Sequence, residues 1–286
     1  MGLLRAEKSA DRREVLGLSG TEKSRIDYDL TIPRLYSSEP LHHATACVLG
    51  EDSFRYLKTV LRLKPGDAVI VFDGYGHEFE ARIDQFSATS AHLALEAQIP
   101  QVKKNIRISL AQAIPKAGKM DSIVKTAAEL GTDDIIPFTA VRSVSRIEGR
   151  NIVHKVARWQ KIVQEAARCS RSSGVTKISP VLSFDAMLSC AASGALKLIF
   201  WEEENETSIR DVLTDPQNST VTDIFVIVGP EGGLSRDEVQ QAGRDGFISV
   251  TLGRQILKVE TAAAVILSII QYEKGIFSQS AGEGGT

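Results

Sequence analysis

The sequence predicts an α/β protein in which a small β-barrel precedes a larger domain built on a parallel sheet. Two patterns carry this prediction. Between Ala68 and Ala97, short apolar runs and period-two alternation are separated by tight turns, which is typical of a small barrel. From Ile106 onward, apolar runs alternate with segments of helical period, as strands and helices do around a parallel sheet. At 286 residues the chain has room for two domains.

Ordered structure is expected to begin near Ile32. The residues before it are polar and carry charges of both signs, so burial cannot offset the entropy of ordering them. A helix is predicted over residues 52–63, where Leu57, Val60 and Leu61 share one face, and Pro65 follows it. We therefore predict a disordered tail at 1–31, a barrel at 32–100, a second domain at 104–277 and a low-complexity, disordered tail at 278–286.

The first half of the second domain is predicted to alternate regularly. Its elements are a strand at 106–112, a helix at 116–130 closed by Gly131, a strand at 134–138, a long helix at 151–169, a strand at 196–201 and a short helix at 208–213. In the long helix, Ile152, Val156, Trp159, Val163 and Ala166 form one apolar stripe. The opposite face is basic.

The stretch from Ile224 to Tyr272 organises the domain. An apolar strand ends at Gly229-Pro230, where proline removes a donor. A helix begins after Ser235, which forms a capping box with Glu238, and Gly246 ends it. A second strand over 247–252 ends at Gly253, and from about residue 260 a helix is apolar on every side, which predicts burial on several faces.

Two strand ends are thus expected to present glycine loops side by side. In an open α/β sheet, ligands bind at the carboxyl ends of strands, where backbone N–H groups can approach them closely. The alternative is that both loops are ordinary turns, since glycine after a strand is common.

Composition excludes several classes of function. Lys and Arg total 34 against 36 for Asp and Glu, so any nucleic-acid binding must come from local patches. The three cysteines are far apart and the five histidines show no HExxH spacing, so we predict neither a metal site nor disulfides. The longest apolar run is shorter than a membrane span, and the start lacks a signal-peptide core. We expect a soluble cytoplasmic protein without a membrane partner.

Local basic residues are the candidates for RNA contact. In the barrel they are Arg34, Arg55, Lys58 and Arg62, and in the second domain they are Arg142, Arg146 and Arg171. The alternative for each group is a solvated surface, which is the commoner fate of exposed basic residues.

Seven motifs together carry a specific resemblance. They are RLY, VLRLKPGD, ELG, VRSV, EAARCSR, VGPEGGLSRDEV and LGRQILKVETA, and the last two are the most specific. In this combination the chain, from about residue 32 to 277, resembles the bacterial 16S rRNA uracil-N3 methyltransferase family. The resemblance implies an N-terminal PUA-like β-barrel, a C-terminal SPOUT methyltransferase domain with a deep trefoil knot, and a homodimer acting on 16S rRNA of the small ribosomal subunit.

The resemblance also implies that S-adenosylmethionine binds in the knot. The pocket positions carried over from it are Gly229, Glu231, Gly232, Leu252, Gly253, Ile256 and Leu257. The chain departs from the family pattern at three places. Cys169 stands where glutamine is usual, Thr176 stands where proline often follows the EAARCSR motif, and Lys258 stands where arginine is common. Lysine keeps the charge but lacks the planar fork for bidentate phosphate contact.

The implied chemistry suggests the catalytic residues. The N3 imide of uracil must lose its proton, and a cationic neighbourhood favours the resulting anion. We expect Glu231, Thr261 and Arg171 near the reacting centre, with Arg142, Arg146 and Arg171 orienting phosphate or base. Glu231 is either a general base or a carboxylate that binds nearby N–H groups, and the second role is favoured.

Three other functions fit parts of the pattern. A SPOUT enzyme acting on a ribose hydroxyl or on tRNA would share the knot and the pocket. A nucleotide-dependent dehydrogenase also uses a glycine loop, but no GxGxxG with an acidic ribose ligand is present. A noncatalytic RNA-binding assembly factor would use the barrel and the basic helix without binding S-adenosylmethionine.

Overall fold

The computed structural model describes residues 32–101, 104–116, 118–143, 150–172 and 174–275. The two predicted tails and Arg146 lie outside these residues. The chain divides into two compact units. In the described part, the first comprises 32–35, Ala44–Val71 and Phe79–Ala97, and the second comprises Tyr36–His43, Phe72–Glu78 and the described residues from 98 to 275.

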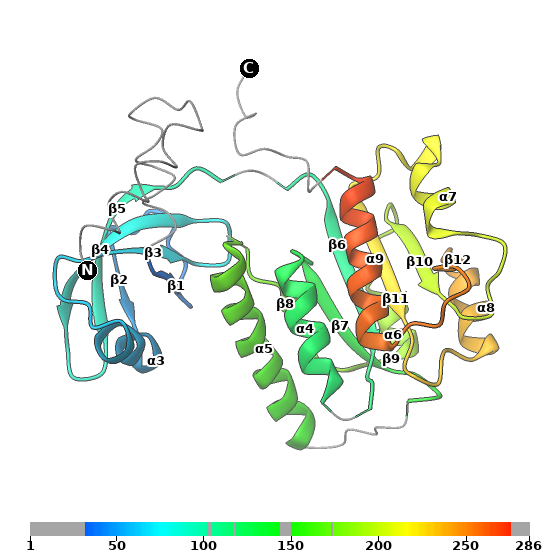
Figure 1. Cartoon of the computed structure of the whole chain (residues 1–286), viewed down its shortest axis with the longest axis horizontal. Coiled ribbons are helices and arrows are strands. Elements are labelled where there is room, and N and C mark those ends of the chain that lie inside the picture. Colours follow the sequence, from blue (N-terminus) through cyan, green and yellow to red (C-terminus); the bar gives the residue numbers. More distant parts are fainter. Residues whose placement is uncertain (1–31, 102–103, 117, 144–149, 173, 276–286) are drawn as a thin grey trace, which may run out of the picture. The chain divides into compact units, whose positions relative to one another are not determined.

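The amino-terminal region forms a five-stranded sheet (Figure 1). Its strands are β1 (Arg34–Tyr36), β2 (Ala46–Leu49), β3 (Ala68–Phe72), β4 (Glu78–Phe86) and β5 (Ala91–Gln98), in the order β1-β3-β4-β5-β2. The helix predicted over 52–63 is found as α3 (Glu51–Arg55), which continues as a π-helix over Tyr56–Val60. Of the predicted apolar face, Leu57 is fully buried, whereas Val60 is 67% exposed.

The second region is a parallel sheet. Its strands are β6 (Arg107–Ala113), β7 (Asp134–Thr139), β8 (Lys177–Ile178), β9 (Leu182–Ser183), β10 (Leu196–Phe200), β11 (Asp223–Val228) and β12 (Ile248–Val250). Every strand pair in it is parallel, and the order is β12-β10-β11-β6-β7-β8, with β9 also pairing with β7. All carboxyl ends of the strands therefore lie at one edge of the sheet.

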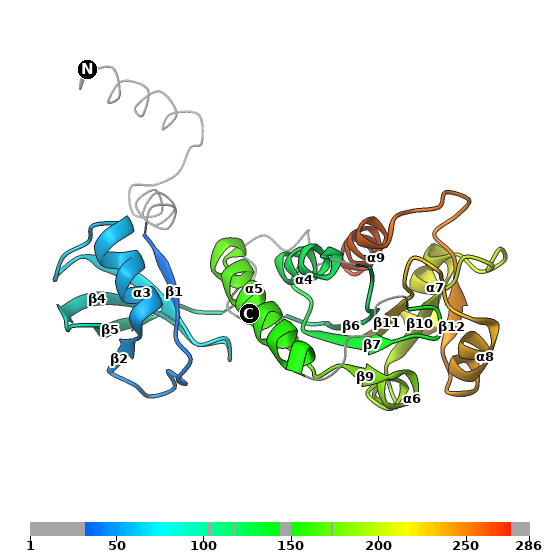
Figure 2. The same cartoon turned by 90° about the horizontal axis from the view of Figure 1, so that it is seen from below.

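Helices cover both faces of this sheet, as Figures 1 and 2 show. On one face lie α4 (Lys119–Glu129), α5 (Arg150–Ser170), α7 (Ile209–Thr214) and α9 (Val259–Glu273); on the other lie α6 (Phe184–Leu188) and α8 (Arg236–Arg244). A short 3-10 helix spans Pro216–Asn218. In β11, Val226 packs on the first face and Phe225 on the second, so each strand buries both sets of side chains. Every helix in the described part of the chain is too short or too polar to span a membrane.

The predicted alternation of strands and helices is confirmed, but two details of the glycine-loop stretch are wrong. The two strands that lead into the loops are not neighbours, because β10 lies between β11 and β12. The second strand is also shorter than predicted and covers only Ile248–Val250. Periodicity describes each strand by itself, whereas strand order depends on where each crossover helix returns the chain.

Helix α8 is fixed at both ends in the predicted way. The Ser235 hydroxyl accepts the backbone N–H of Glu238, and the Glu238 carboxylate accepts the backbone N–H of Ser235 at 2.8 Å. Glu238 is buried, and its other oxygen accepts the N–H of Val141 at 2.9 Å. The capping box thus also anchors the loop after β7. Gly246 ends the helix with φ +85°, a conformation that favours glycine.

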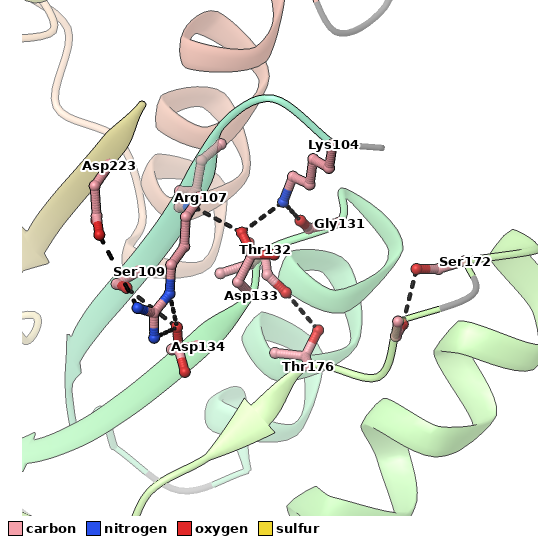
Figure 3. Close-up of polar contacts among 12 residues, drawn as sticks. Lys104, Arg107, Ser109, Gly131, Thr132, Asp133, Asp134, Ser172, Thr176 and Asp223 are labelled. Carbon is pink, nitrogen blue, oxygen red and sulfur yellow. Dashed lines mark hydrogen bonds and ion pairs between the residues drawn. The ribbon is translucent and has the colours of Figure 1, made fainter. Parts of the chain in front are cut away.

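A polar cluster joins the amino-terminal ends of the central strands (Figure 3). Asp133 accepts the N–H of Ile108 at 2.7 Å and pairs with Lys104 at 2.6 Å. Beside it, the Arg107 guanidinium pairs with Asp134 at 2.7 Å, while Asp223 lies 4.0 Å away. These bonds fix the register between β6 and β7 at their start.

We expect Asp133→Ala to lower the free energy of unfolding by about 1–3 kcal/mol, because it leaves the Ile108 N–H without its acceptor. Asp223→Ala is the matched control, since its 4.0 Å contact to the half-exposed Arg107 is worth about 0–1 kcal/mol. Urea unfolding of both variants measures the difference. Equal losses would show that the backbone contact of Asp133 does not set the register.

Candidate functional site

The site lies at the carboxyl edge of the parallel sheet, where the loops after β6, β10, β11 and β12 leave their strands. The loop after β11 turns tightly, because the Gly233 N–H donates to the Pro230 carbonyl at 2.9 Å. Leu234 then enters the core. An ideal Cβ on Gly229 would lie 3.0 Å from Leu234 Cγ, so this glycine permits the close return of the loop.

The backbone conformation of Gly233 favours glycine. Its φ is +69°, in the left-handed region. A Cβ at this position would also overlap the carboxylate of Glu202, which follows β10. The exposed Glu202 therefore lies against the glycine loop. In the sequence, Glu202 begins a glutamate-rich run over residues 202–206, and its contact with the glycine loop becomes visible only once β10 is placed between β11 and β12.

The loop after β7 closes another side of the site. Arg142 Nη1 donates to the Gly232 carbonyl at 3.2 Å, and a Cβ on Gly232 would lie 3.3 Å from both the Cβ and the carbonyl oxygen of Arg142. Two positions predicted from separate motifs are thus in direct contact. Arg142 is exposed, so its guanidinium can also reach solvent or a ligand.

Glu231 is held by the loop after β6. Both carboxylate oxygens accept the N–H of Lys116 at 3.1 Å, and Lys119 Nζ lies 3.0 Å from Oε1. The same ammonium lies 3.5 Å from the Glu260 carboxylate at the start of α9. Lys119 therefore links three chain segments that are distant in sequence.

These contacts determine the ionisation of Glu231. Partial burial opposes ionisation, but the hydrogen bonds from Lys119 and from backbone N–H groups outweigh it and lower the pKa of Glu231. Conversely, the hydrogen bond to Glu231 raises the pKa of Lys119 despite some desolvation, and the charge of Glu260 adds to this effect. A carboxylate with a lowered pKa is a weak proton acceptor, which favours the N–H-binding role over the general base.

Gln112 lies at the carboxyl end of β6 and is fully buried. Its Nε2 donates to the carbonyls of Ala113 at 2.9 Å and Gly229 at 3.3 Å. Its Oε1 is buried without a hydrogen-bond partner among the described residues. Burying an acceptor without a hydrogen bond costs free energy, unless a ligand or a water molecule donates a hydrogen bond to it. Gln112 and Lys119 were not predicted as site residues, because a glutamine at the end of a strand and a lysine at the start of a helix are only a weak signal of a site.

The second glycine loop follows β12. Gly253 has φ +98°, and its N–H donates to the Thr251 hydroxyl at 3.1 Å. Leu252 and Leu257 are half-buried, whereas Ile256 is 96% exposed. Thr261 is exposed in the first turn of α9. The pocket positions carried over from the resemblance thus fall on two loops of the same edge, but Ile256 points to solvent in the isolated chain.

The predicted RNA-contact residues of the amino-terminal region differ in their surroundings. Arg34 is only 6% exposed, so its burial in β1 counts against direct RNA contact. Arg55 pairs with Glu51 one helical turn away, at 2.5 Å. Lys58 Nζ lies 5.1 Å from the Phe54 ring centroid. Arg62 is exposed with φ +56°. Hydrophobic periodicity cannot distinguish the buried arginine from the exposed ones.

Arg171 follows α5 with φ +60°, at a position where helices commonly end in glycine. The basic face predicted for α5 is largely neutralised: Arg158 pairs with Asp121 at 2.6 Å, and Arg168 pairs with Glu165. Burial and the charge of Glu165 raise the pKa of the neighbouring Cys169 thiol. Cys169 is thus a neutral side chain that donates to Glu165 at 3.6 Å.

This edge shows no metal site among the described residues. Among the described residues, no group of three or more His, Cys, Asp or Glu could hold a metal ion. A cavity of about 260 Å³ lies at the opposite edge, beside the cluster of Figure 3. Among its lining residues, Arg107 pairs with Asp134 at 2.7 Å and lies 4.0 Å from Asp223.

Comparison with protein-family models gives two matches. An RNA methyltransferase domain matches residues 102–271, and an RNA methyltransferase PUA domain matches residues 49–94. Among characterised relatives, the ribosomal RNA small subunit methyltransferase E of Mycobacterium bovis is 30% identical over 233 residues, covering 79% of this chain and 86% of the relative.

Two solved structures share the fold. Ribosomal RNA small subunit methyltransferase E from Neisseria gonorrhoeae, bound to S-adenosyl methionine, has a TM-score of 0.75 at 29% identity and covers 84% of this chain and 97% of its own. A methyltransferase from Legionella pneumophila with the bound cofactor SAM has a TM-score of 0.74 at 26% identity, with the same coverage.

Proposed function

The chain belongs to the RNA methyltransferase family, and from this premise we propose that it methylates N3 of a uridine in 16S rRNA of the small ribosomal subunit with S-adenosylmethionine. One observation carries the proposal: the glycine loop Gly229–Gly233, which Arg142 and Lys119 contact, lies at the carboxyl edge where ligands of parallel sheets bind. The Neisseria gonorrhoeae enzyme and the Legionella pneumophila methyltransferase, both with bound cofactor, share the fold at TM-scores of 0.75 and 0.74.

The residues present fit the cofactor. Gly232 and Gly253 offer exposed backbone, and Gln112 Oε1 is a buried acceptor in need of a donor. We propose that the backbone of Gly229, Glu231, Gly232 and Gly253, with the side chains of Leu252, Ile256 and Leu257, holds S-adenosylmethionine. When bound, the cofactor supplies an electrophilic methyl group.

The chain's own task is to position the uracil and favour its anion. Because Lys116 and Lys119 occupy the Glu231 carboxylate, we propose that Glu231 orders the loop and that the N3 proton leaves to solvent. Arg142 is proposed to provide the cationic neighbourhood, and Thr261 to orient the base with its hydroxyl. Arg171 lies between the end of α5 and the start of β8, at the amino edge of the sheet and away from the glycine loops, so we propose it as a phosphate contact instead. We extend the RNA-contact proposal to Arg55, Lys58 and Arg62 and, outside the described residues, to Arg146.

Methyl transfer from labelled cofactor to small-subunit particles and to naked rRNA tests the function. The expected product nucleoside is 3-methyluridine, identified by mass spectrometry. A ribose-methylated nucleoside, or methylation of tRNA alone, would favour another substrate for the same fold. Cofactor binding without any transfer to RNA would contradict the proposal.

We expect Arg171→Gly to weaken RNA binding. Glycine suits the left-handed backbone at this position, so the substitution relieves strain of about 1 kcal/mol while removing a cation. The slope of log affinity against log salt should fall by about one. Arg171→Lys keeps the charge and is the control. Unchanged affinity and slope in the glycine variant would remove Arg171 from the RNA site.

We also propose a domain arrangement, a trefoil knot and a homodimer. The barrel is proposed at 32–100 as an RNA-binding domain, and the SPOUT domain with its knot at 104–277. Ile256 at 96% exposed and the half-buried Val265 on α9 are apolar surface that a second copy could cover. Sedimentation tests the dimer, which a monomer at micromolar concentration would contradict. A crystal structure traced through residues 224–272 tests the knot.

A further inference from the structure

Three histidines and a tyrosine lie together outside the glycine-loop site, on two short segments of the second unit, Tyr36–His43 and Phe72–Glu78. The ring centroids of His42 and His43 are 3.7 Å apart, and those of His42 and His77 are 5.0 Å apart. His42 and His43 are exposed, and Tyr75 is 65% exposed. We call His42, His43, Tyr75 and His77 the histidine patch.

A buried carboxylate fixes both segments of the patch. The Asp73 side chain is fully inaccessible, and its Oδ2 accepts the N–H of Leu41 at 2.9 Å and contacts His77 Nδ1 at 2.8 Å. Its Oδ1 accepts the N–H groups of Tyr75 at 2.7 Å and His77 at 3.1 Å. A carboxylate only accepts, so His77 Nδ1 carries the hydrogen. One side chain thus satisfies donors from both segments, and the rings are held in a fixed relation.

The backbone of the patch is held in conformations that side chains rarely adopt. His43 has φ +62°, and Gly74 and Gly76 have φ +74° and +95°. A left-handed histidine persists only where its surroundings impose it, and such positions concentrate at functional sites. The rings of His42 and His43 are exposed, so core packing does not explain the left-handed backbone of His43.

From this geometry we propose that the histidine patch is a stacking site for an unpaired RNA nucleotide; this inference rests on RNA being the substrate. Aromatic and imidazole faces hold splayed bases in single-stranded RNA, and the stacking tolerates any base. Within the same unit Tyr75 forms a β-bridge with Gly174, three residues after Arg171, so a candidate phosphate contact is close in the chain. The described histidines lack the geometry of a metal site.

The test uses the full chain and the small-subunit rRNA transcript of the methyl-transfer assay. We expect His42→Ala with His43→Ala to weaken RNA binding roughly tenfold or more, because each lost stacking contact is worth about tenfold. The salt slope should stay unchanged, since no phosphate contact is removed. His42→Phe with His43→Phe should restore most of the affinity. His92→Ala is the control, because its ring contacts Ser87 at 2.8 Å and lies outside the patch.

Each other outcome contradicts the inference. Wild-type affinity in the double alanine variant would exclude a role in binding, and a smaller salt slope without rescue by phenylalanine would indicate charge instead of stacking. Zn²⁺ binding by calorimetry that is lost in the double alanine variant would assign the patch to metal. Methyl transfer by the wild-type preparation is measured in parallel, so a chain that binds RNA through the patch but does not methylate refutes only the proposed function.

Discussion

Replacing Gly233 with alanine is expected to lower the affinity for S-adenosylmethionine at least tenfold and to reduce methyl transfer to the same extent, while the chain stays folded. The left-handed φ of +69° makes any Cβ strained by roughly 1–2 kcal/mol. The new methyl group would also displace the Glu202 carboxylate from the glycine loop. Both effects act on the loop that is proposed to hold the cofactor. Calorimetric titration with S-adenosylmethionine measures the loss.

Two further variants separate the causes. Gly243→Ala in α8 is the matched control, because an added Cβ there meets nothing within 4 Å and alanine favours a helix by about 1 kcal/mol. It should bind the cofactor normally and unfold at a slightly higher temperature. Glu202→Ala combined with Gly233→Ala removes the overlap but keeps the backbone strain, so it should recover part of the affinity. Wild-type binding by Gly233→Ala alone would place the cofactor away from this loop.

Local patterns predict the elements of this fold well, because each depends on neighbours in sequence. The apolar run of β11, the apolar stripe of α5 and the capping box of Ser235 with Glu238 all appear as expected. A buried parallel strand needs a continuous apolar run, and a helix needs a cap, so both can be predicted from the local sequence.

The rest of the site depends on how distant segments meet. Nothing in the residues after β10 shows that Glu202 will contact Gly233, because β10 is found between β11 and β12 only in three dimensions. The same holds for Lys119, whose partners are more than a hundred residues away. Arg34 shows a second limit of sequence patterns. A charged residue in a short strand is expected to be exposed, but the structure buries Arg34.

Lys119→Met is expected to weaken cofactor binding by about tenfold to a hundredfold. The ammonium bridges Glu231 and Glu260, so its removal leaves two carboxylates near one another without their shared cation, as when one partner of a charge pair is truncated. Repulsion should move the glycine loop away from the start of α9. Lys125→Met on the same helix is the control, since its pair with Glu129 is exposed and at 3.8 Å.

The pH dependence gives this prediction a second readout. The pKa of Glu231 is lowered from its ordinary 4.5, so its contribution is present above that pH and is lost as pH falls through the lowered value. The pKa of Lys119 is raised from 10.5, so its contribution is present below that pH and is lost as pH rises through the raised value. The bridge therefore acts across the neutral range.

Without Lys119, Glu231 loses the hydrogen bond that does most to keep it ionised, so the acid limb of cofactor binding should move to higher pH in Lys119→Met. Adding Glu231→Gln removes one of the two negative charges that repel each other, so it should restore part of the affinity for the cofactor at neutral pH. It should also abolish the shifted acid limb. Additive losses in the double variant, with the acid limb unchanged, would mean that the two residues support the site separately.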